Sequence, residues 1–482
     1  MSRTGFLHDV LGSVFVRGQG EVADPFAEPA GAETGAGWLA RLGGRGADSA
    51  QPSLGALCEA LLSERGEMSG NRIARALLAR LAEGGEPVAL ELFALLASDF
   101  DLDADAAARA VSDYAREPTA KGLERLVTAT EPRRQELLRR LNRLPGATEA
   151  LVGLRVALLE HAREDAALAR VDVDFRHLFR SWFNRGFLVL REIDWATPAN
   201  VLEKIIEYEA VHAIDGFEAL RARLEPPDRR CFAFFHPAMP EEPLIFVEVA
   251  LVTGSPATVR ELLVPERESI AAEAADTAVF YSISNCQRGL AGISFGHFLI
   301  KQVAAELRAQ LPNLDTFRTL SPVPGLMRWV AATLEADASA HAPPGDGAGV
   351  RDGAEPVDRD ALELARRVAS GEGEPPDEAG RETLARLVAR YLVDARREDG
   401  QPLDPVARFH LGNGASLDRV LPEADRFERG RRQSAGAMVS YLYDLPRVTR
   451  QHEAYAATRE IAHSEAVRSL LAPPRRGRRK AS

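Results

Sequence analysis

The chain has 482 residues, of which 45% are hydrophobic and 27% charged, and its formal net charge is −11 at pH 7. This length allows two or three domains with a sizeable core. The acidic balance argues against a general nucleic-acid binder, because such proteins present a basic surface to phosphates. Basic residues still cluster locally, at positions 229–230, 429–432 and 474–480. These clusters suit a small phosphorylated ligand better than a long polyanion.

Cysteine use and the ends of the chain favour a cytoplasmic location. The three cysteines, Cys58, Cys231 and Cys286, form no CxxC pair, so we expect a reducing compartment and no disulfide framework. The first residues lack a signal-peptide pattern, and no apolar run has the length of a membrane span. We therefore expect no membrane association.

The first part of the chain is expected to be helical. Residues 1–55 are rich in Gly, Ala, Ser and Pro and are interpreted as a loose lead-in. Residues 56–182 place apolar side chains at helical spacing, as at Leu92, Leu95 and Leu96, and show few strand signals. This pattern predicts an all-α domain. Its expected role is homo-oligomerisation, as a dimer or tetramer.

Strand signals begin after the helical part and predict a mixed α/β region. Residues 187–190 form a short β-prone run. Residues 231–236 and 244–251 are two further strand candidates, joined by a loop of hairpin length. Between residues 190 and 231, Thr197 and Pro198 are expected to open a helix, Thr197 as its N-cap and Pro198 as its first residue.

Residues 335–380 are rich in Ala, Gly, Pro, Asp and Glu and are interpreted as a low-complexity insertion. Helical spacing resumes over residues 382–396. The predicted fold class is therefore α+β and multidomain, with the all-α domain followed by a mixed α/β catalytic domain over residues 183–482.

A strand, a helix and a second strand follow one another between residues 278 and 320. The spacing predicts a βαβ unit with parallel strands. In such a unit the loop that opens the helix, residues 286–294, and the end of the second strand, at Ser321, lie at the same edge of the sheet. The loop has two glycines and Arg288 before a helix N-terminus, which suits a phosphate group. A plain strand-to-helix turn remains an equal alternative.

Ser321 stands in the stretch Leu-Ser-Pro-Val-Pro-Gly, between a hydrophobic residue and two alternating prolines. A residue before proline is restricted to extended backbone, so the segment should be stiff and the serine fixed. A serine fixed in this way is suited to chemistry, although a rigid surface turn would use the same residues.

His410 is a candidate partner for Ser321, because a strand-like approach and Gly-Asn-Gly should hold it at a turn, where functional side chains are often placed. His8, His161 and His177 fall in helical sequence and are interpreted as structural or exposed. His452 begins an HExxH-like pattern, but Ala456 occupies the place of the second histidine, so no zinc site is expected.

A competing motif lies in the loop. The sequence Gly-Ile-Ser-Phe-Gly at residues 292–296 matches the GxSxG nucleophile elbow of α/β-hydrolases. An elbow needs a strand that runs directly into it, whereas a polar loop precedes Ser294. We therefore interpret Ser294 as a helix cap or an oxygen ligand near the loop.

Nine blocks of the sequence together resemble one known family. They are residues 181–190, 193–198, 202–212, 231–237, 242–251, 281–285, 287–293, 319–325 and 409–415. In this order, with stretches such as Ser-Trp-Phe-Asn-Arg-Gly-Phe and Thr-Leu-Ser-Pro-Val-Pro-Gly, they resemble malonyl-CoA decarboxylase over most of residues 181–443. The helical N-terminal part is similar to that family's N-terminal domain, more loosely.

The resemblance implies a catalytic domain of the N-acetyltransferase (GNAT) type. It implies conversion of malonyl-CoA to acetyl-CoA and CO2 without a metal or an organic cofactor. The family's catalytic serine and histidine match Ser321 and His410, and Arg288 and Asn413 are expected to help bind the substrate. The family's malonyl-CoA-binding loop matches Ala291, Gly292, Ile293, Ser294, Phe295, Gly296 and His297.

Two loop positions depart from the family's pattern. Animal members have a glutamate where this chain has Ser294, so any acid role there is absent or moved. His297 stands where Asn or Thr is expected, which alters local hydrogen bonding.

The implied mechanism is loss of CO2 to give a thioester enolate, followed by protonation at the α-carbon. We expect His410 to donate this proton and Ser321 to hydrogen-bond both His410 and the malonyl carboxylate. Two other classes stay open. One is an acyl-CoA transferase or thioesterase that uses the same loop, with Ser294 or Ser321 acylated. The other is a non-catalytic CoA-binding regulator.

Overall fold

The computed structural model describes residues 52–63, 66–264, 267–293, 299–338, 349–350, 358–371 and 374–472. The chain divides into two compact units. The first is the chain up to Val189 with two short stretches, Phe235–Glu242 and Gln287–Ser294, and the second is the remainder. All three cysteines are buried, and none forms a disulfide bond among the described residues. In the described ranges, no helix is long and apolar enough to cross a membrane.

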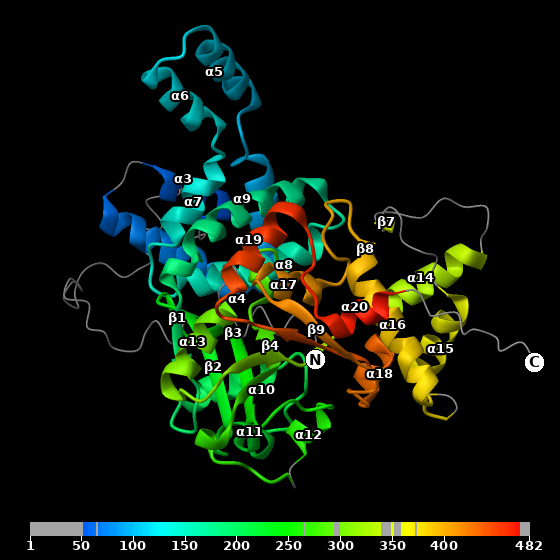
Figure 1. The fold of residues 1–482 in the computed structure, drawn as a ribbon. Coiled ribbons are helices and arrows are strands. Elements are labelled where there is room, and N and C mark those ends of the chain that lie inside the picture. The colour runs from blue at the N-terminus through cyan, green and yellow to red at the C-terminus, as the bar shows by residue number, and fades with distance from the viewer. Residues whose placement is uncertain are drawn as a thin grey trace, which may run out of the picture. The chain divides into compact units, whose positions relative to one another are not determined.

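The part of the first unit up to Trp182 is built from helices, as predicted (Figure 1). They are α3 (Leu54–Leu62), α4 (Glu67–Ser98), α5 (Ala104–Arg116), α6 (Ala120–Thr130), α7 (Arg133–Leu141), α8 (Ala147–His161) and α9 (Ala166–Trp182). The described part of residues 52–182 contains no strand. Leu92 and Leu96, from the predicted apolar stripe, are fully buried, so helical periodicity alone identified this core.

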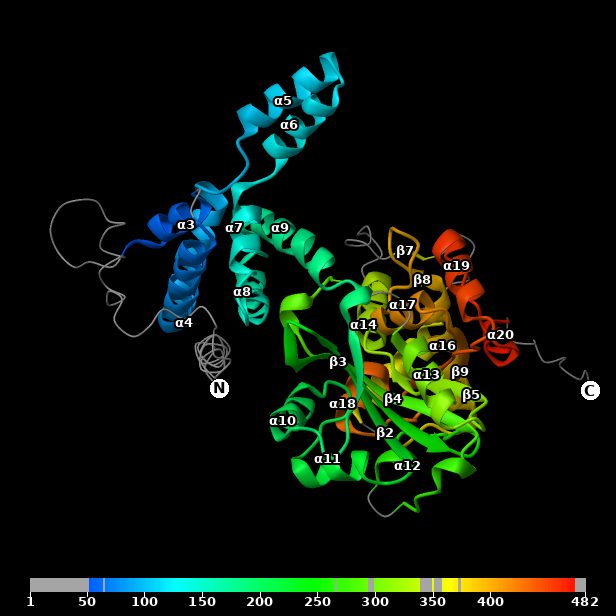
Figure 2. The ribbon, with the colours of Figure 1, turned by 90° about the vertical axis from the view of Figure 1, so that its left-hand side faces the viewer.

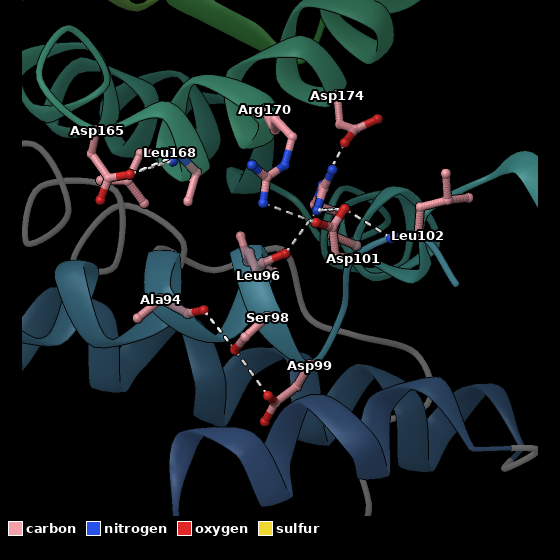
Figure 3. Close-up of polar contacts among 12 residues, drawn as sticks. Ala94, Leu96, Ser98, Asp99, Asp101, Leu102, Asp165, Leu168, Arg170 and Asp174 are labelled. Carbon is pink, nitrogen blue, oxygen red and sulfur yellow. Dashed lines mark hydrogen bonds and ion pairs between the residues drawn. The ribbon is translucent and has the colours of Figure 1, made fainter. Parts of the chain in front are cut away.

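A buried ion-pair network joins three of these helices (Figure 3). The Arg134 guanidinium of α7 donates to the carboxylates of Asp174 in α9 and Asp101, the latter at 2.6 Å. It also donates to the Leu96 carbonyl in α4 at 2.9 Å, and Gln135 donates to Asp174 at 2.6 Å. Arg134 and Asp174 are 3% and 4% exposed, so each charge depends on the other for compensation.

Helices α5 and α6 form a hairpin that stands away from the other helices of this unit (Figure 1). α6 buries none of its residues, and α5 buries only Ala107. Four large apolar side chains of this hairpin and the residue before it are at least 38% exposed: Leu102, Val111, Leu123 and Val127. The hairpin therefore carries an apolar surface that its own unit does not cover.

The second unit is organised around a mixed sheet (Figure 2). Its strands are β1 (Val189–Glu192), β2 (Arg229–His236), β3 (Met239–Val252), β4 (Thr277–Asn285), β5 (Thr316–Thr319), β6 (Ser321–Pro322), β9 (Ser416–Leu421) and β10 (Met438–Leu442). The order is β1-β2-β3-β4-β5-β10-β6, with β9 also paired to β10. Strands β4 and β5 are parallel and α13 (Leu299–Gln310) connects them, so the predicted βαβ unit is confirmed.

Helices and short elements complete this unit. They are α10 (Ala199–Tyr208), α11 (Phe217–Leu224), α12 (Arg260–Leu263), α14 (Leu326–Ala338), α15 (Arg359–Ser370), α16 (Glu378–Asp394), α17 (Pro405–Gly412), α18 (Glu428–Ser434), α19 (Val448–Thr458) and α20 (Glu465–Leu471). A separate two-stranded sheet pairs β7 (Gly349–Val350) with β8 (Ala395–Arg396). Of the expected insertion at 335–380, α15 is regular helix, and residues 339–348, 351–357 and 372–373 lie outside the described ranges.

The two faces of the sheet are lined by different side chains. Tyr281, Leu320 and Met438 belong to one buried cluster. Successive residues of a strand point to opposite faces, so Phe280 and Ser321 lie on the other face. The alternation at residues 320–321 therefore separates the apolar cluster from the serine.

Two local predictions are wrong. The N-cap of α10 is Pro198 rather than Thr197, because the Thr197 hydroxyl is bonded to Asp194 instead. The approach to His410 is a helix, α17, and not a strand. Asp404 caps that helix and Pro405 is its first residue. This helix-start signal outweighs the β propensity of the residues that follow it in the chain.

Candidate active site

Ser321 and His410 lie side by side in the second unit. The Ser321 Oγ and the His410 Nε2 are 3.0 Å apart, although 89 positions separate the residues in the chain. They are 5% and 2% exposed. Ser321 begins β6, where it pairs with Val439 of β10, and His410 lies in the last turn of α17. The structure thus brings together the two residues that the sequence singled out.

One buried carboxylate holds both segments. The Asp404 Oδ1 accepts the backbone N–H groups of Val406 and Ala407, each at 2.9 Å, and so caps α17. Its Oδ2 accepts the N–H of Gly325, at the end of the Ser-Pro-Val-Pro-Gly stretch, at 3.2 Å. Asp404 is fully buried, so its position is fixed. The serine segment and the histidine helix are therefore tied to each other directly.

The other side of the His410 ring is held by two tyrosines of the β10 segment. The His410 Nδ1 and the Tyr443 hydroxyl oxygen are 2.9 Å apart, and the ring stacks on Tyr441 with centroids 4.5 Å apart. Burial lowers the pKa of His410 to about 3, because the charged form loses hydration. The imidazole of the free protein is therefore neutral near pH 7, with a partner at each ring nitrogen.

Thr319 completes the arrangement around the serine. The Ser321 hydroxyl donates to the Thr319 Oγ1 at 2.9 Å, and the same oxygen accepts the Tyr441 N–H at 3.1 Å. With its proton directed to Thr319, Ser321 can accept an N–H from His410. The Ser321, His410 and Thr319 side chains thus form one hydrogen-bonded network through which a proton can be shared. A serine that served only a rigid surface turn would not need these buried partners.

Replacing Tyr443 by Phe is expected to lower kcat about tenfold, because the His410 Nδ1 loses a buried hydrogen bond that supports the imidazolium form. The pH profile of kcat should shift to lower pH for the same reason. Tyr441→Phe is the matched control, since it keeps the stacked ring. An unchanged profile in Tyr443→Phe would show that this hydroxyl does not tune His410.

The described part of the predicted substrate loop, which ends at Ile293, belongs to the first unit. After β4, a short turn of 3-10 helix over Arg288–Leu290 leads to Gly292, which has a φ of 75° that favours glycine. The Arg288 guanidinium is 70% exposed and lies 3.3 Å from the Glu160 carboxylate. The Arg288 guanidinium is therefore accessible to a phosphate, which would compete with the Glu160 carboxylate for it.

Helix α8 fixes this loop. The Arg155 guanidinium, 1% exposed, donates to the carbonyls of Gly289 and Ala291 at 2.6 and 3.0 Å. The Asp172 carboxylate orients it at 2.7 Å. A Cβ at Gly289 would overlap the Val152 carbonyl, so only glycine allows this close approach. With these carbonyls bonded to arginine, the loop backbone is rigid before any ligand binds.

The remaining predicted site residues are placed as follows. Asn413 is buried and closes α17, and its Nδ2 donates to the Phe409 carbonyl at 2.7 Å. Its Oδ1 has no hydrogen-bond partner among the described residues. Ile293 is buried behind Gly292. Ser294, Phe295, Gly296 and His297 lie outside the described residues. β4 ends nine residues before Ser294 and a 3-10 turn intervenes, which does not match a nucleophile elbow.

Sequence reasoning missed Thr319, Asp404, Tyr441 and Tyr443. The two tyrosines, two positions apart in a β-prone run, signal side chains on one face of a strand. Asp404 before Pro405 is a readable helix start. Among the described residues there is no cluster of His, Cys, Asp and Glu that could hold a metal ion. The predicted roles of the site residues, and cofactor independence, remain predictions.

Comparison with known proteins gives a consistent result. The family model described as "Malonyl-CoA decarboxylase C-terminal domain" matches residues 186–481. The model described as "Malonyl-CoA decarboxylase N-terminal domain" matches residues 100–183. The mitochondrial malonyl-CoA decarboxylase of the goose Anser anser anser is 33% identical over 401 residues, 79% of each chain. The mouse protein is 34% identical over 372 residues, 72% of this chain and 73% of its own.

Two crystal structures of bacterial malonyl-CoA decarboxylases are closer in sequence. The one from Rhodopseudomonas palustris is 49% identical with a TM-score of 0.79, and it covers 86% of this chain and 98% of its own. The one from Agrobacterium vitis is 48% identical with a TM-score of 0.77, covering 87% and 100%. The helical N-terminal part followed by a mixed α/β domain is thus confirmed as the fold class, and the chain belongs to the malonyl-CoA decarboxylase family.

Proposed function

We propose that this protein converts malonyl-CoA to acetyl-CoA and CO2, with Ser321 and His410 as its catalytic pair. The observation that carries the proposal is their 3.0 Å contact in a buried site of a chain that belongs to this family. The contact joins a side chain that can hold a carboxylate to one that can transfer a proton.

The first chemical step breaks the bond between the α-carbon and the carboxylate. The electron pair passes to the thioester carbonyl and gives an enolate, so the bond must stand perpendicular to the thioester plane. Ser321 is held by the β6 pairing and by the stiff proline segment, which suits it to orient the carboxylate. A buried site strengthens such hydrogen bonds because water does not compete for them.

The second step adds one proton to the α-carbon. His410 is neutral in the free protein, and the malonyl carboxylate beside it would favour the imidazolium by charge pairing. One proton is then taken up from solvent as the substrate binds. After CO2 leaves, His410 gives that proton to the α-carbon, and the products are acetyl-CoA and a neutral imidazole. Tyr443 accepts from the Nδ1–H of the imidazolium throughout.

The decisive experiment incubates the purified protein with malonyl-CoA labelled in its free carboxylate. We expect labelled CO2 and acetyl-CoA in equal amounts. Free CoA in place of acetyl-CoA would favour the thioesterase alternative, and acyl transfer would need an added acceptor. No turnover with malonyl-CoA would overturn the proposal and favour a CoA-binding regulator.

The loop at residues 288–294 is proposed to bind the CoA pyrophosphate. Replacing Arg155 by Met should then raise the KM for malonyl-CoA about tenfold at unchanged kcat, since the loop loses two buried, charge-assisted hydrogen bonds. Arg163→Met, at an exposed position after α8, is the control. Malonyl-N-acetylcysteamine lacks the nucleotide, and its KM should not respond to Arg155→Met. Equal KM increases for both substrates would contradict the assignment.

We propose that the reaction needs neither metal nor organic cofactor, because the substrate thioester itself accepts the electron pair. Dialysis against EDTA should leave the rate unchanged, and full metal dependence would refute this. The cytoplasmic location stays a prediction of the sequence, while the goose, mouse and rat relatives are named mitochondrial. Fractionation of the cells that produce the protein would test it.

The predicted homo-oligomer would use the apolar surface of the α5–α6 hairpin. Leu123 and Val127 are 45% and 56% exposed there, one helical turn apart. A Leu123→Glu, Val127→Glu double variant should lower the molar mass measured by light scattering. The same change at the exposed polar positions Thr128 and Thr130 is the control.

A further inference from the structure

One buried side chain beside the catalytic pair has no task in the proposed reaction. Thr319 is the last residue of β5 and is 1% exposed. Strand β10 pairs with β5 at Arg318 and with β6 at Ser321, so Thr319 lies between these two pairings. Thr319 and Ser321 are two positions apart in extended backbone, so their side chains lie on the same face of the sheet. Thr319 is therefore placed to act on the Ser321 hydroxyl.

A backbone group holds the Thr319 hydroxyl in place. The Thr319 Oγ1 accepts the Tyr441 N–H at 3.1 Å and the Ser321 hydroxyl at 2.9 Å. A hydroxyl oxygen has two acceptor lone pairs, so both are filled. A backbone N–H can only donate, so the bond from Tyr441 cannot reverse its direction. Thr319 thus presents a fixed acceptor to the Ser321 proton.

The direction of the Ser321 bond decides where His410 carries its hydrogen. The one proton of Ser321 goes to Thr319, so the Ser321 Oγ is the acceptor in its 3.0 Å contact with the His410 Nε2. The donor in that contact is then an Nε2–H. Burial lowers the pKa of His410 to about 3, so near pH 7 the ring is neutral and has a single N–H. The Nδ1 is therefore bare and accepts the Tyr443 hydroxyl at 2.9 Å.

The reverse order would give Ser321 a different reactivity. If the Ser321 hydroxyl donated to a bare Nε2, His410 could remove its proton, and Ser321 could attack a thioester as serine nucleophiles do. With the hydrogen on Nε2, His410 has no lone pair that faces Ser321. Thr319, Ser321, His410 and Tyr443 are each at most 5% exposed, so solvent does not supply other donors or acceptors. Protein groups therefore set the order of these hydrogen bonds.

We propose that Thr319 is a positioning residue for the catalytic pair: by accepting the Ser321 proton, it places the hydrogen of His410 on Nε2 and keeps Ser321 from acting as a nucleophile. This inference deepens the proposed function, and its consequence for the rate rests on that function. The Ser321 hydroxyl can turn from Thr319 to the malonyl carboxylate. Acylation of Ser321, the first step of a thioesterase or an acyl transferase, is disfavoured.

Nitrogen NMR of the free protein tests this order. The ten histidines are labelled with ¹⁵N, and the His410 signals are assigned by their loss in His410→Gln. Long-range proton–nitrogen spectra at pH 7 show which ring nitrogen carries the hydrogen. We expect the His410 hydrogen on Nε2 in the wild-type protein. A hydrogen on Nδ1 would overturn the proposal, whatever the variants do.

Two variants at position 319 separate the hydroxyl from the packing. Thr319→Val keeps a similar shape but removes the acceptor, so the Ser321 proton should turn to the Nε2 and the His410 hydrogen should move to Nδ1. Thr319→Ser keeps the hydroxyl and should keep the hydrogen on Nε2. Thr316→Val is the matched control, because it makes the same change on the opposite face of β5. A hydrogen that stays on Nε2 in folded Thr319→Val would mean that Thr319 does not set the order.

Kinetics then measure the consequence for the proposed reaction. Thr319→Val should lower kcat for CO2 release about tenfold at little changed KM, because the Ser321 proton is held by the more basic His410 nitrogen. Thr319→Ser should recover most of that loss. A wild-type rate in Thr319→Val would remove Thr319 from the reaction.

Mass spectrometry checks the nucleophile directly. Wild-type protein incubated with malonyl-CoA should carry no acyl group on Ser321, and an acylated Ser321 would overturn the proposal. The position of the His410 hydrogen is measured without substrate. If the protein failed to decarboxylate malonyl-CoA, the hydrogen would still be expected on Nε2, so the two failures are distinguishable.

Discussion

Replacing His410 by Gln should lower kcat for CO2 release from malonyl-CoA about 10²- to 10⁴-fold, the usual contribution of general acid catalysis. Gln keeps a donor near Ser321 but cannot give up a proton at neutral pH. Ser321→Ala should cause a loss of similar size, because the carboxylate and the imidazole lose the hydroxyl between them. Stopped assays of labelled CO2 measure both variants.

The double variant distinguishes a working pair from two separate residues. If Ser321 and His410 act as one unit, the double variant should be about as slow as the slower single variant. If instead the fold-loss in kcat of the double variant equals the product of the two single losses, Ser321 and His410 act independently. Unchanged binding of acetyl-CoA and unchanged melting temperatures serve as controls for the fold. A single variant with the wild-type rate would remove that residue from the mechanism.

Replacing Asp174 by Ala should destabilise the helical unit by about 3 to 5 kcal/mol, because it leaves the buried Arg134 charge without a main partner. Arg134 also bonds Asp101 and the Leu96 carbonyl, yet Asp101 is partly exposed and already shared with Arg170 (Figure 3). Urea unfolding followed by far-ultraviolet circular dichroism measures the change in the free energy of unfolding.

Two further variants identify the cause of that loss. Asp113→Ala breaks an exposed pair with Arg116 and should change the free energy by less than about 1 kcal/mol. Replacing Arg134 and Asp174 together by Leu removes both charges and should recover much of the stability lost in Asp174→Ala. A destabilisation in Asp174→Ala no larger than that in Asp113→Ala would contradict the importance of the buried pair.

Local sequence signals predicted much of the fold. Apolar periodicity identified the helices of the first unit. A loop of hairpin length between two strand candidates identified the pair around residues 231–251, and alternation identified the strand that begins at residue 278. The parallel pairing of β4 with β5 followed from the helix between them. The main local error, a strand before His410, came from giving β propensity more weight than the Asp404–Pro405 helix start.

The partners of the catalytic pair could not be read in the same way. The contact between Tyr443 and His410 depends on where β10 lies against β5 and on how α17 is seated. Neither is encoded within a short window of sequence. Residue types thus identified the chemistry, and only three-dimensional packing showed the electrostatic setting.

The double role of Asp404 has a consequence for how this chain can change in length. Because this one carboxylate joins the Gly325 backbone to the start of α17, the length of the chain between residues 325 and 404 need not set the distance between serine and histidine. Lengthening a loop costs free energy only logarithmically. Insertions and deletions around α15 should therefore be tolerated in homologous genes far more readily than a single substitution at position 404.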